Sequence, residues 1–140
     1  MKGILLLSHG TLSKGMYETT QWFMGEDIPQ YDYLCLEPDD SPEAFDEKIK
    51  AKLETLDTGE GVIFIVDLMG GTPFNRSATF MSQGVDVFTG LNLPLVLELL
   101  GKRLFEGEEI DMAALEQIGK DGVVYVNKLF ASMASGSDDE

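Results

Sequence analysis

The only histidine of this 140-residue chain, His9, stands between Ser8 and Gly10 at the end of a short aliphatic run, in the stretch LLLSHG. A histidine in that position can be a buried packing residue, a metal ligand or a nucleophile. With one histidine and one cysteine, the chain cannot build a zinc site of the usual kind by itself, so we expect no metal and no cofactor. A packing residue and a nucleophile remain as the two interpretations.

A second chemistry-bearing residue, Asp67, ends the most apolar run of the chain, GVIFIVD. If the two runs are neighbouring parallel strands, His9 and Asp67 lie at the same sheet edge. A carboxylate that accepts from the Nδ1–H of an imidazole leaves the Nε2 lone pair pointing outward, and such an imidazole is a competent nucleophile toward phosphorus. The alternative is structural: His9 donates to a strand-end carbonyl, and Asp67 caps the helix that follows.

The stretch VDLMGGTPFN, residues 66–75, is typical of a phosphate cradle. Gly70 and Gly71 allow a backbone path that turns successive amides toward one point, and Thr72 and Pro73 open a helix whose unpaired N–H groups favour an anion. Neither the GxxxxGK[ST] loop nor the GxGxxG fingerprint is present, so we expect the phosphoryl donor to be another phosphoprotein. An ordinary strand-to-helix connection is the alternative for these glycines.

Apolar runs alternate with helical patterns along the whole chain. The clearest helix covers residues 41–56, where Ser41 can cap, Pro42 suits the first turn, and apolar residues recur on one face. This order predicts an α/β fold: an open, mostly parallel, twisted sheet with helices on both faces. Strands are expected at residues 3–8, 31–37, 61–67, 85–90 and 122–127, and helices at residues 11–25, 41–56, 72–83, 94–103 and 111–119.

Composition and charge narrow the class of protein. The 25 acidic and 10 basic residues give a formal charge of −15, which disfavours nucleic acid and anionic membranes and favours a partner with a basic face. Neither a signal peptide nor an apolar run of about 20 residues is present, so we expect a cytoplasmic protein. We expect one domain over residues 1–130 and a disordered acidic tail over residues 131–140.

At these residues the chain resembles the enzyme IIA domain of the mannose-type (mannose, fructose, sorbose) bacterial sugar phosphotransferase system. A strand ending in His-Gly, followed at this distance by Asp-x-x-Gly-Gly-Thr-Pro-Phe-Asn, is a specific signature. The resemblance runs in order over residues 2–128. It is carried by ILLLSHG at 4–10, VIFIVDLMGGTPFN at 62–75, TGLNLPLVLELL at 89–100 and GKDGVVYVN at 119–127.

The resemblance implies a phosphocarrier. His9 would accept a phosphoryl group on Nε2 from the phosphocarrier protein HPr and pass it to a histidine of enzyme IIB during coupled uptake and phosphorylation of a sugar, with the membrane IIC and IID subunits as indirect partners. Asp67 would orient His9. The resemblance also implies a homodimer that exchanges the last strand, residues 123–126, as an antiparallel edge strand. The residues matching the family's phosphate loop are Gly70, Gly71, Thr72, Pro73, Phe74 and Asn75.

Three other functions were weighed. A receiver module phosphorylated on Asp67 needs magnesium held by carboxylates at the end of the first strand, where this chain has Ser8 and His9. The related phosphotransfer subunit of dihydroxyacetone kinase shares the fold and the histidine, but TPFN and GLNLP favour the sugar branch. A non-catalytic, flavodoxin-like binding module with an acidic face is the third. The acidic end, in place of the Ala/Pro-rich linker of fused relatives, indicates a free-standing subunit.

Overall fold

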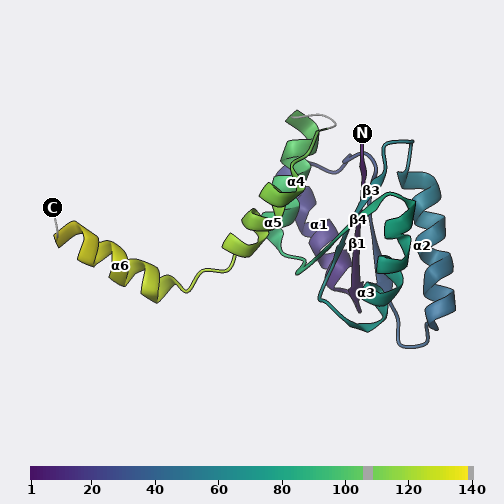
Figure 1. Cartoon of the computed structure of the whole chain (residues 1–140), viewed down its shortest axis with the longest axis horizontal. Helices are drawn as coiled ribbons and strands as arrows, with labels where there is room; N and C mark the ends of the chain where they lie inside the picture. Colours follow the sequence, from purple (N-terminus) through teal and green to yellow (C-terminus); the bar gives the residue numbers. More distant parts are fainter. Residues whose placement is uncertain (106–108, 139–140) are drawn as a thin grey trace.

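A computed structural model describes residues 1–105 and 109–138 of the chain (Figure 1). Strands and helices alternate over the first two thirds of the sequence, and three helices follow the last strand. The elements are β1 (Gly3–His9), α1 (Leu12–Met24), β2 (Tyr31–Leu36), α2 (Pro42–Leu56), β3 (Val62–Val66), α3 (Gly71–Ala78), the 3-10 helix η1 (Thr79–Gln83), β4 (Val85–Thr89), α4 (Leu93–Phe105), α5 (Met112–Asp121) and α6 (Val126–Asp138).

The described strands form one sheet in the order β2-β1-β3-β4, with every neighbouring pair parallel. β1 and β3 are central, which explains why both are continuous apolar runs: each is covered by helices on both faces. The register pairs Leu7 with Val66 on one side of β1 and His9 with Leu36 on the other. His9 and the residue after β3 therefore reach the same carboxyl edge.

Helices cover both faces of the sheet, as predicted (Figure 1). Side chains alternate along each strand, so Leu6 and Ile65 join the core beneath α1, α4 and α5, whereas Leu7 and Phe64 join the core beneath α2 and η1. The capping prediction for α2 is confirmed, since Ser41 Oγ accepts from the Ala44 amide at 3.1 Å.

The predicted helix at residues 72–83 ends at Gln83 as expected, but it starts one residue earlier and is a 3-10 helix in its last five residues. The helix α3 begins at Gly71 with Gly70 as its N-cap, so Thr72 lies inside the first turn and caps nothing. After Ala78 the backbone tightens into η1, which ends at Gly84 in the left-handed conformation (φ 82°). The Gly70–Gly71 pair makes the earlier start possible, because positive φ at both positions sets the direction of the first helical turn.

The predicted last strand at residues 122–127 is wrong for a single chain. Residues 123–125 have no regular structure and are exposed, and Val126 starts α6. A strand needs a neighbouring backbone to pair with, and no described segment of the same chain lies along this one. The described sheet therefore has four parallel strands and lacks the expected antiparallel edge strand.

The helix α6 projects away from the body of the protein (Figure 1). It includes residues 131–138 of the expected disordered tail, and residues 139–140 lie outside the described residues. Apolar residues at helical spacing are exposed along it: Val126, Leu129, Phe130 and Met133. Within the described ranges, no helix combines the length and apolar character that crossing a bilayer requires.

Candidate functional site

The structure brings His9 and Asp67 together at the carboxyl edge of the sheet. The Asp67 amide donates to Leu7 O at 3.0 Å and so continues the ladder between β3 and β1 for one residue. Asp67 Oδ2 then lies 2.8 Å from His9 Nδ1 and accepts from the His9 amide at 3.0 Å, while Oδ1 accepts from the Leu68 amide at 2.9 Å. One carboxylate thus holds both the main chain and the ring of His9.

Burial divides this pair into a fixed partner and an accessible one. The Asp67 side chain is 6% exposed, and the His9 side chain is 46% exposed. A carboxylate oxygen at hydrogen-bond distance from Nδ1 favours the tautomer with the proton on Nδ1, which leaves the Nε2 lone pair free. The arrangement leaves the Nε2 atom of His9 accessible at the surface, while the Asp67 carboxylate that holds the ring is shielded from solvent.

The Nε2 edge of His9 faces the start of α3. A Cβ built on Gly71 would lie 2.9 Å from both Cε1 and Nε2 of His9, so only glycine lets the backbone approach the ring this closely without a shift of either group. Gly70 and Gly71 adopt φ values of 102° and 80°, which L side chains rarely tolerate. The first amides of α3 have no partner within the helix, and together with the helix dipole they favour an anion beside Nε2.

The other residues of the predicted phosphate loop lie further along α3. Thr72 is half-buried, and its hydroxyl bonds to none of the described residues. Phe74 packs against the core beneath α2, and Asn75 is exposed without a hydrogen bond to the described part of the chain. The geometry therefore brings Gly71 to His9 directly, and it shows no contact that would assign a task to Asn75.

Two further features accompany the site. Exposed apolar side chains stand near His9 and Asp67 in the sequence: Leu12, Leu68 and Met69. Ser8, directly before His9, is completely buried and hydrogen-bonded to the turn that follows His9. The sequence carries a signal for this role of Ser8, because the hydroxyl of a serine at the end of a buried aliphatic strand needs a hydrogen-bond partner.

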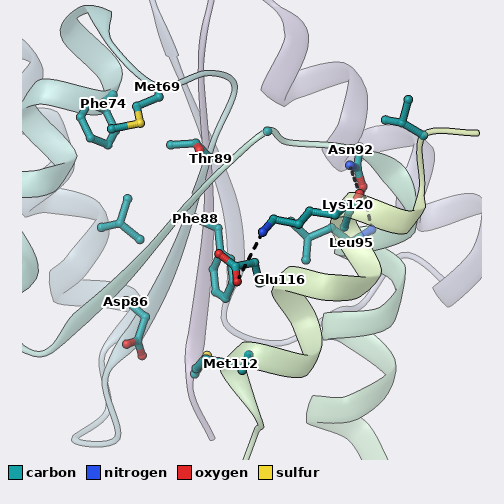
Figure 2. Close-up of a pocket in the computed structure, with 15 residues that line it drawn as sticks. Met69, Phe74, Asp86, Phe88, Thr89, Asn92, Leu95, Met112, Glu116 and Lys120 are labelled. Atoms are coloured by element: carbon teal, nitrogen blue, oxygen red, sulfur yellow. Dashed lines mark hydrogen bonds and ion pairs between the residues drawn. The ribbon is translucent and has the colours of Figure 1, made fainter.

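A cavity of about 700 Å³ opens beside the outer edge of β4 (Figure 2). β4 lines it with Asp86 to Thr89, and α5 lines the opposite side with Glu116 and Lys120, whose charged groups are 3.8 Å apart. Met69 and Phe74 reach it from the loop after β3 and from α3. In the part of the chain that the structure describes, no group of three or more His, Cys, Asp or Glu side chains is placed to hold a metal ion.

Fold and site together define an open parallel α/β protein with a carboxylate-held histidine next to the N-terminus of a helix. Residues 3–116 match the family model of the PTS system fructose IIA component, EIIA-man. The chain therefore belongs to the mannose-type family of phosphotransferase-system IIA components, as its motifs indicate. The model match ends before the segment at residues 119–127.

Individual relatives agree with this assignment. The mannose-specific EIIAB component of the PTS in Escherichia coli K12 is 30% identical over 123 residues, which cover 86% of this chain and 38% of that protein. The sorbose-specific EIIA component of Lacticaseibacillus casei is 31% identical over 98 residues, 69% of this chain and 70% of that protein. This chain thus spans well under half of the E. coli relative.

A solved structure supports the fold. The PTS IIA protein associated with the fucose utilization operon of Streptococcus pneumoniae superposes with a TM-score of 0.82 at 28% identity, covering 92% of this chain and 96% of that one. The mannose/sorbose-specific IIA subunit of Enterococcus faecalis superposes with a TM-score of 0.76 at 27% identity, covering 89% of this chain and 94% of that one.

Proposed function

We propose that this protein is a cytoplasmic phosphocarrier subunit that accepts a phosphoryl group from phospho-HPr on Nε2 of His9 and passes it to enzyme IIB during sugar uptake. The observation that carries the proposal is the 2.8 Å contact between His9 Nδ1 and Asp67 Oδ2, with Nε2 directed at Gly71. A packing histidine needs no half-exposed ring facing a glycine. The mannose, fructose and sorbose systems named among the relatives favour sugar over dihydroxyacetone.

The proposed step needs no group beyond the donor and these residues. The Nε2 lone pair of His9 attacks phosphorus and forms the new P–N bond, the bond from phosphorus to the donor atom of HPr breaks, and its electron pair leaves with HPr. The proton stays on Nδ1, and Asp67 balances the positive charge that develops on the ring. Transfer to enzyme IIB reverses these roles.

The loop after β3 is the proposed phosphate cradle. The start of α3, whose first amides have no partner within the helix, lies next to the Nε2 edge of His9, where the oxygens of the transferring group would carry negative charge. The free hydroxyl of Thr72 is a further donor on the same turn. We assign to this loop Gly70, Gly71, Thr72, Phe74 and Asn75, with the last two as neighbours of the cradle.

We also propose a homodimer in which residues 123–126 of each subunit pair with β4 of the other. The outer edge of β4 lines the 700 Å³ cavity, and the described residues offer no side chain that caps its amides. Val123, Val124 and Tyr125 are exposed apolar residues that follow α5 directly. An open strand edge and an apolar segment of high β-propensity suit one another.

The proposed function is tested by intact mass after incubation with phosphoenolpyruvate, enzyme I and HPr. We expect wild type to gain one acid-labile phosphoryl group and His9→Ala to gain none, because the chain has no other histidine. Lys14→Ala, an exposed change on the first turn of α1, is the matched control and should be phosphorylated. Addition of enzyme IIB should discharge the wild type. No phosphorylation of wild type by active partners would return His9 to a structural role in a binding module.

A further inference from the structure

Ser8 is a buried hydroxyl at the end of the most deeply buried part of β1. Its side chain is inaccessible to solvent, and the alternation of the strand places it with Leu6 on the face beneath α1, opposite to His9. A buried hydroxyl lowers stability unless it is hydrogen-bonded, so its partners show what it is used for.

One hydrogen-bond partner of Ser8 lies in the turn after His9, and the other lies in the first turn of α1. Ser8 Oγ accepts from the Ser13 amide at 2.7 Å and donates to Gly10 O at 3.2 Å. Ser13 is the second residue of α1, where the N-cap side chain usually accepts this hydrogen bond, but the N-cap Thr11 makes no such bond. Ser8 thus replaces the missing cap and ties down the turn at the same time.

This turn sets the position of the His9 ring. The His9 amide is held by Asp67 and the Gly10 amide by Leu36 O at 3.0 Å, so Ser8 supplies the third anchor, on the Gly10 carbonyl. Gly10 itself adopts φ 55°, which glycine tolerates because it has no Cβ. The Gly71 backbone lies next to the ring on the side of Cε1 and Nε2, and its missing side chain leaves Nε2 open.

We infer that Ser8 is a positioning residue for His9: its hydroxyl fixes the Gly10–Thr11 turn and, through it, the direction of Nε2 toward the start of α3. This inference rests on the proposed function, in which Nε2 is the phosphoryl acceptor. A displacement of about 1 Å in a reacting group can lower a rate about 100-fold. Loss of the hydroxyl therefore affects the transfer step more than the docking of HPr.

The test compares Ser8→Ala with Ser8→Thr and with Thr20→Val. Thr20 is a matched control because, like Ser8, it is a fully buried residue whose hydroxyl makes two hydrogen bonds, here to Tyr17 O and the Tyr31 hydroxyl. It lies in the C-terminal half of α1, away from His9. Single-turnover transfer from phospho-HPr is measured against HPr concentration, and urea unfolding shows that each variant is folded. We expect Ser8→Ala to lower the maximal rate about tenfold or more without changing the half-saturating concentration. Ser8→Thr should restore the rate, and Thr20→Val should keep it despite a similar loss of stability.

A second readout does not depend on HPr. The ¹⁵N shifts of the His9 ring report its tautomer, and we expect Ser8→Ala to weaken the preference for the proton on Nδ1, whereas Thr20→Val should leave it unchanged. If wild type accepts no phosphoryl group, the proposed function fails, and these shifts alone decide whether Ser8 positions the ring. A folded Ser8→Ala variant with the wild-type rate and the wild-type shifts would overturn the inference.

Discussion

Gly71 is the residue whose replacement most directly tests the geometry around His9. It combines a φ of 80° with a virtual Cβ position 2.9 Å from the ring atoms Cε1 and Nε2. Gly84 is a natural comparison, because its φ of 82° is almost the same while a Cβ there would meet open space. Comparing alanine substitutions at the two positions therefore separates the effect of backbone strain from the effect of a methyl group next to His9.

We expect Gly71→Ala to lower phosphoryl transfer from HPr by at least an order of magnitude, because the methyl group must displace either the ring or the start of α3. Both Gly71→Ala and Gly84→Ala should lose about 1–2 kcal/mol of unfolding free energy from the left-handed backbone. Rapid-quench transfer assays and urea titrations measure the two effects. Equal transfer rates in the two variants would show that the close approach of Gly71 has no role in catalysis.

The sequence predicts that His9 and Asp67 lie together, because this prediction requires only knowing where the two strands end. His9 and Asp67 each terminate an apolar run, and parallel neighbours must bring such ends together. The approach of Gly71 to the ring and the anchoring of the turn by Ser8 depend on tertiary positions that no local pattern encodes. Local capping preferences favour a helix start at Thr72, whereas the positive φ values of the two glycines place the N-cap at Gly70 and the start of α3 at Gly71.

At the scale of elements, α3 is attached to α2 by a bidentate ion pair. Arg76 Nε and Nη2 donate to the two Asp46 oxygens at 2.8 and 2.7 Å. This pair holds the helix whose first turn forms the proposed phosphate cradle. The hydrogen bond from the Arg76 guanidinium lowers the pKa of the Asp46 carboxyl below its ordinary value of 3.8.

This shift predicts how stability depends on pH. In the unfolded chain Asp46 binds a proton near pH 3.8, whereas in the folded chain it does so only at lower pH. The contribution of the ion pair to the free energy of unfolding is therefore fully present above about pH 4 and is lost as the pH falls through the pKa of the folded state. We expect Asp46→Asn to lose about 0.5–1 kcal/mol at pH 7 and progressively less below pH 4. Urea unfolding at pH 7 and pH 3 measures this, with exposed Asp39→Asn as the control. A loss that is the same at both pH values would contradict the assignment.

The two outer strands of the sheet differ in how their edges are protected. On β2, the Tyr33 amide donates to Asp32 Oδ1 at 2.8 Å, and just beyond β2 the Glu37 amide donates to Asp40 Oδ2 at 3.0 Å. Lys52 and Lys48, both on α2, hold these two carboxylates at 2.7 and 2.8 Å. The β2 edge is therefore occupied by side chains, whereas the β4 edge faces the cavity.

Removal of this protection should open a second pairing edge. We expect Asp32→Ala combined with Asp40→Ala to produce concentration-dependent association beyond that of wild type, because the Tyr33 and Glu37 amides lose their acceptors. Light scattering coupled to gel filtration measures the mass, and Glu54→Ala, on the exposed side of α2, controls for lost charge. A double variant with the mass of wild type at all concentrations would show that these side chains do not guard the edge.

The same elements explain where prediction from the sequence succeeds and fails. The four described strands are buried against helices of the same chain, so their apolar runs are sufficient to predict them from the sequence. The segment at residues 122–127 has the same β-branched and aromatic composition, but no described strand of the single chain pairs with it. Periodicity shows that a segment can be a strand, and only the arrangement of neighbouring backbones decides whether it is one.

At the scale of the whole molecule, the formal charge of −15 and the open sheet edge bear on association. Like charges repel when two copies meet, so a dimer needs a contact with backbone pairing and apolar burial rather than attraction between surfaces. The cavity beside β4 offers both, and the apolar side chains at residues 123–126 are between 47% and 82% exposed in the single chain. In the proposed dimer, this segment of one subunit lies along β4 of the other.

Val124→Pro tests the proposed exchange. Proline removes the amide that a strand at this position would donate, and it is excluded from paired strands, while Val124 itself is exposed in the single chain. We expect wild type to elute with twice the 15.4 kDa chain mass and Val124→Pro with a single chain mass, at unchanged far-UV circular dichroism. Ser132→Pro breaks α6 but leaves residues 123–126 intact, so it should stay dimeric. A dimeric Val124→Pro, or a monomeric Ser132→Pro, would move the interface from this segment to another surface.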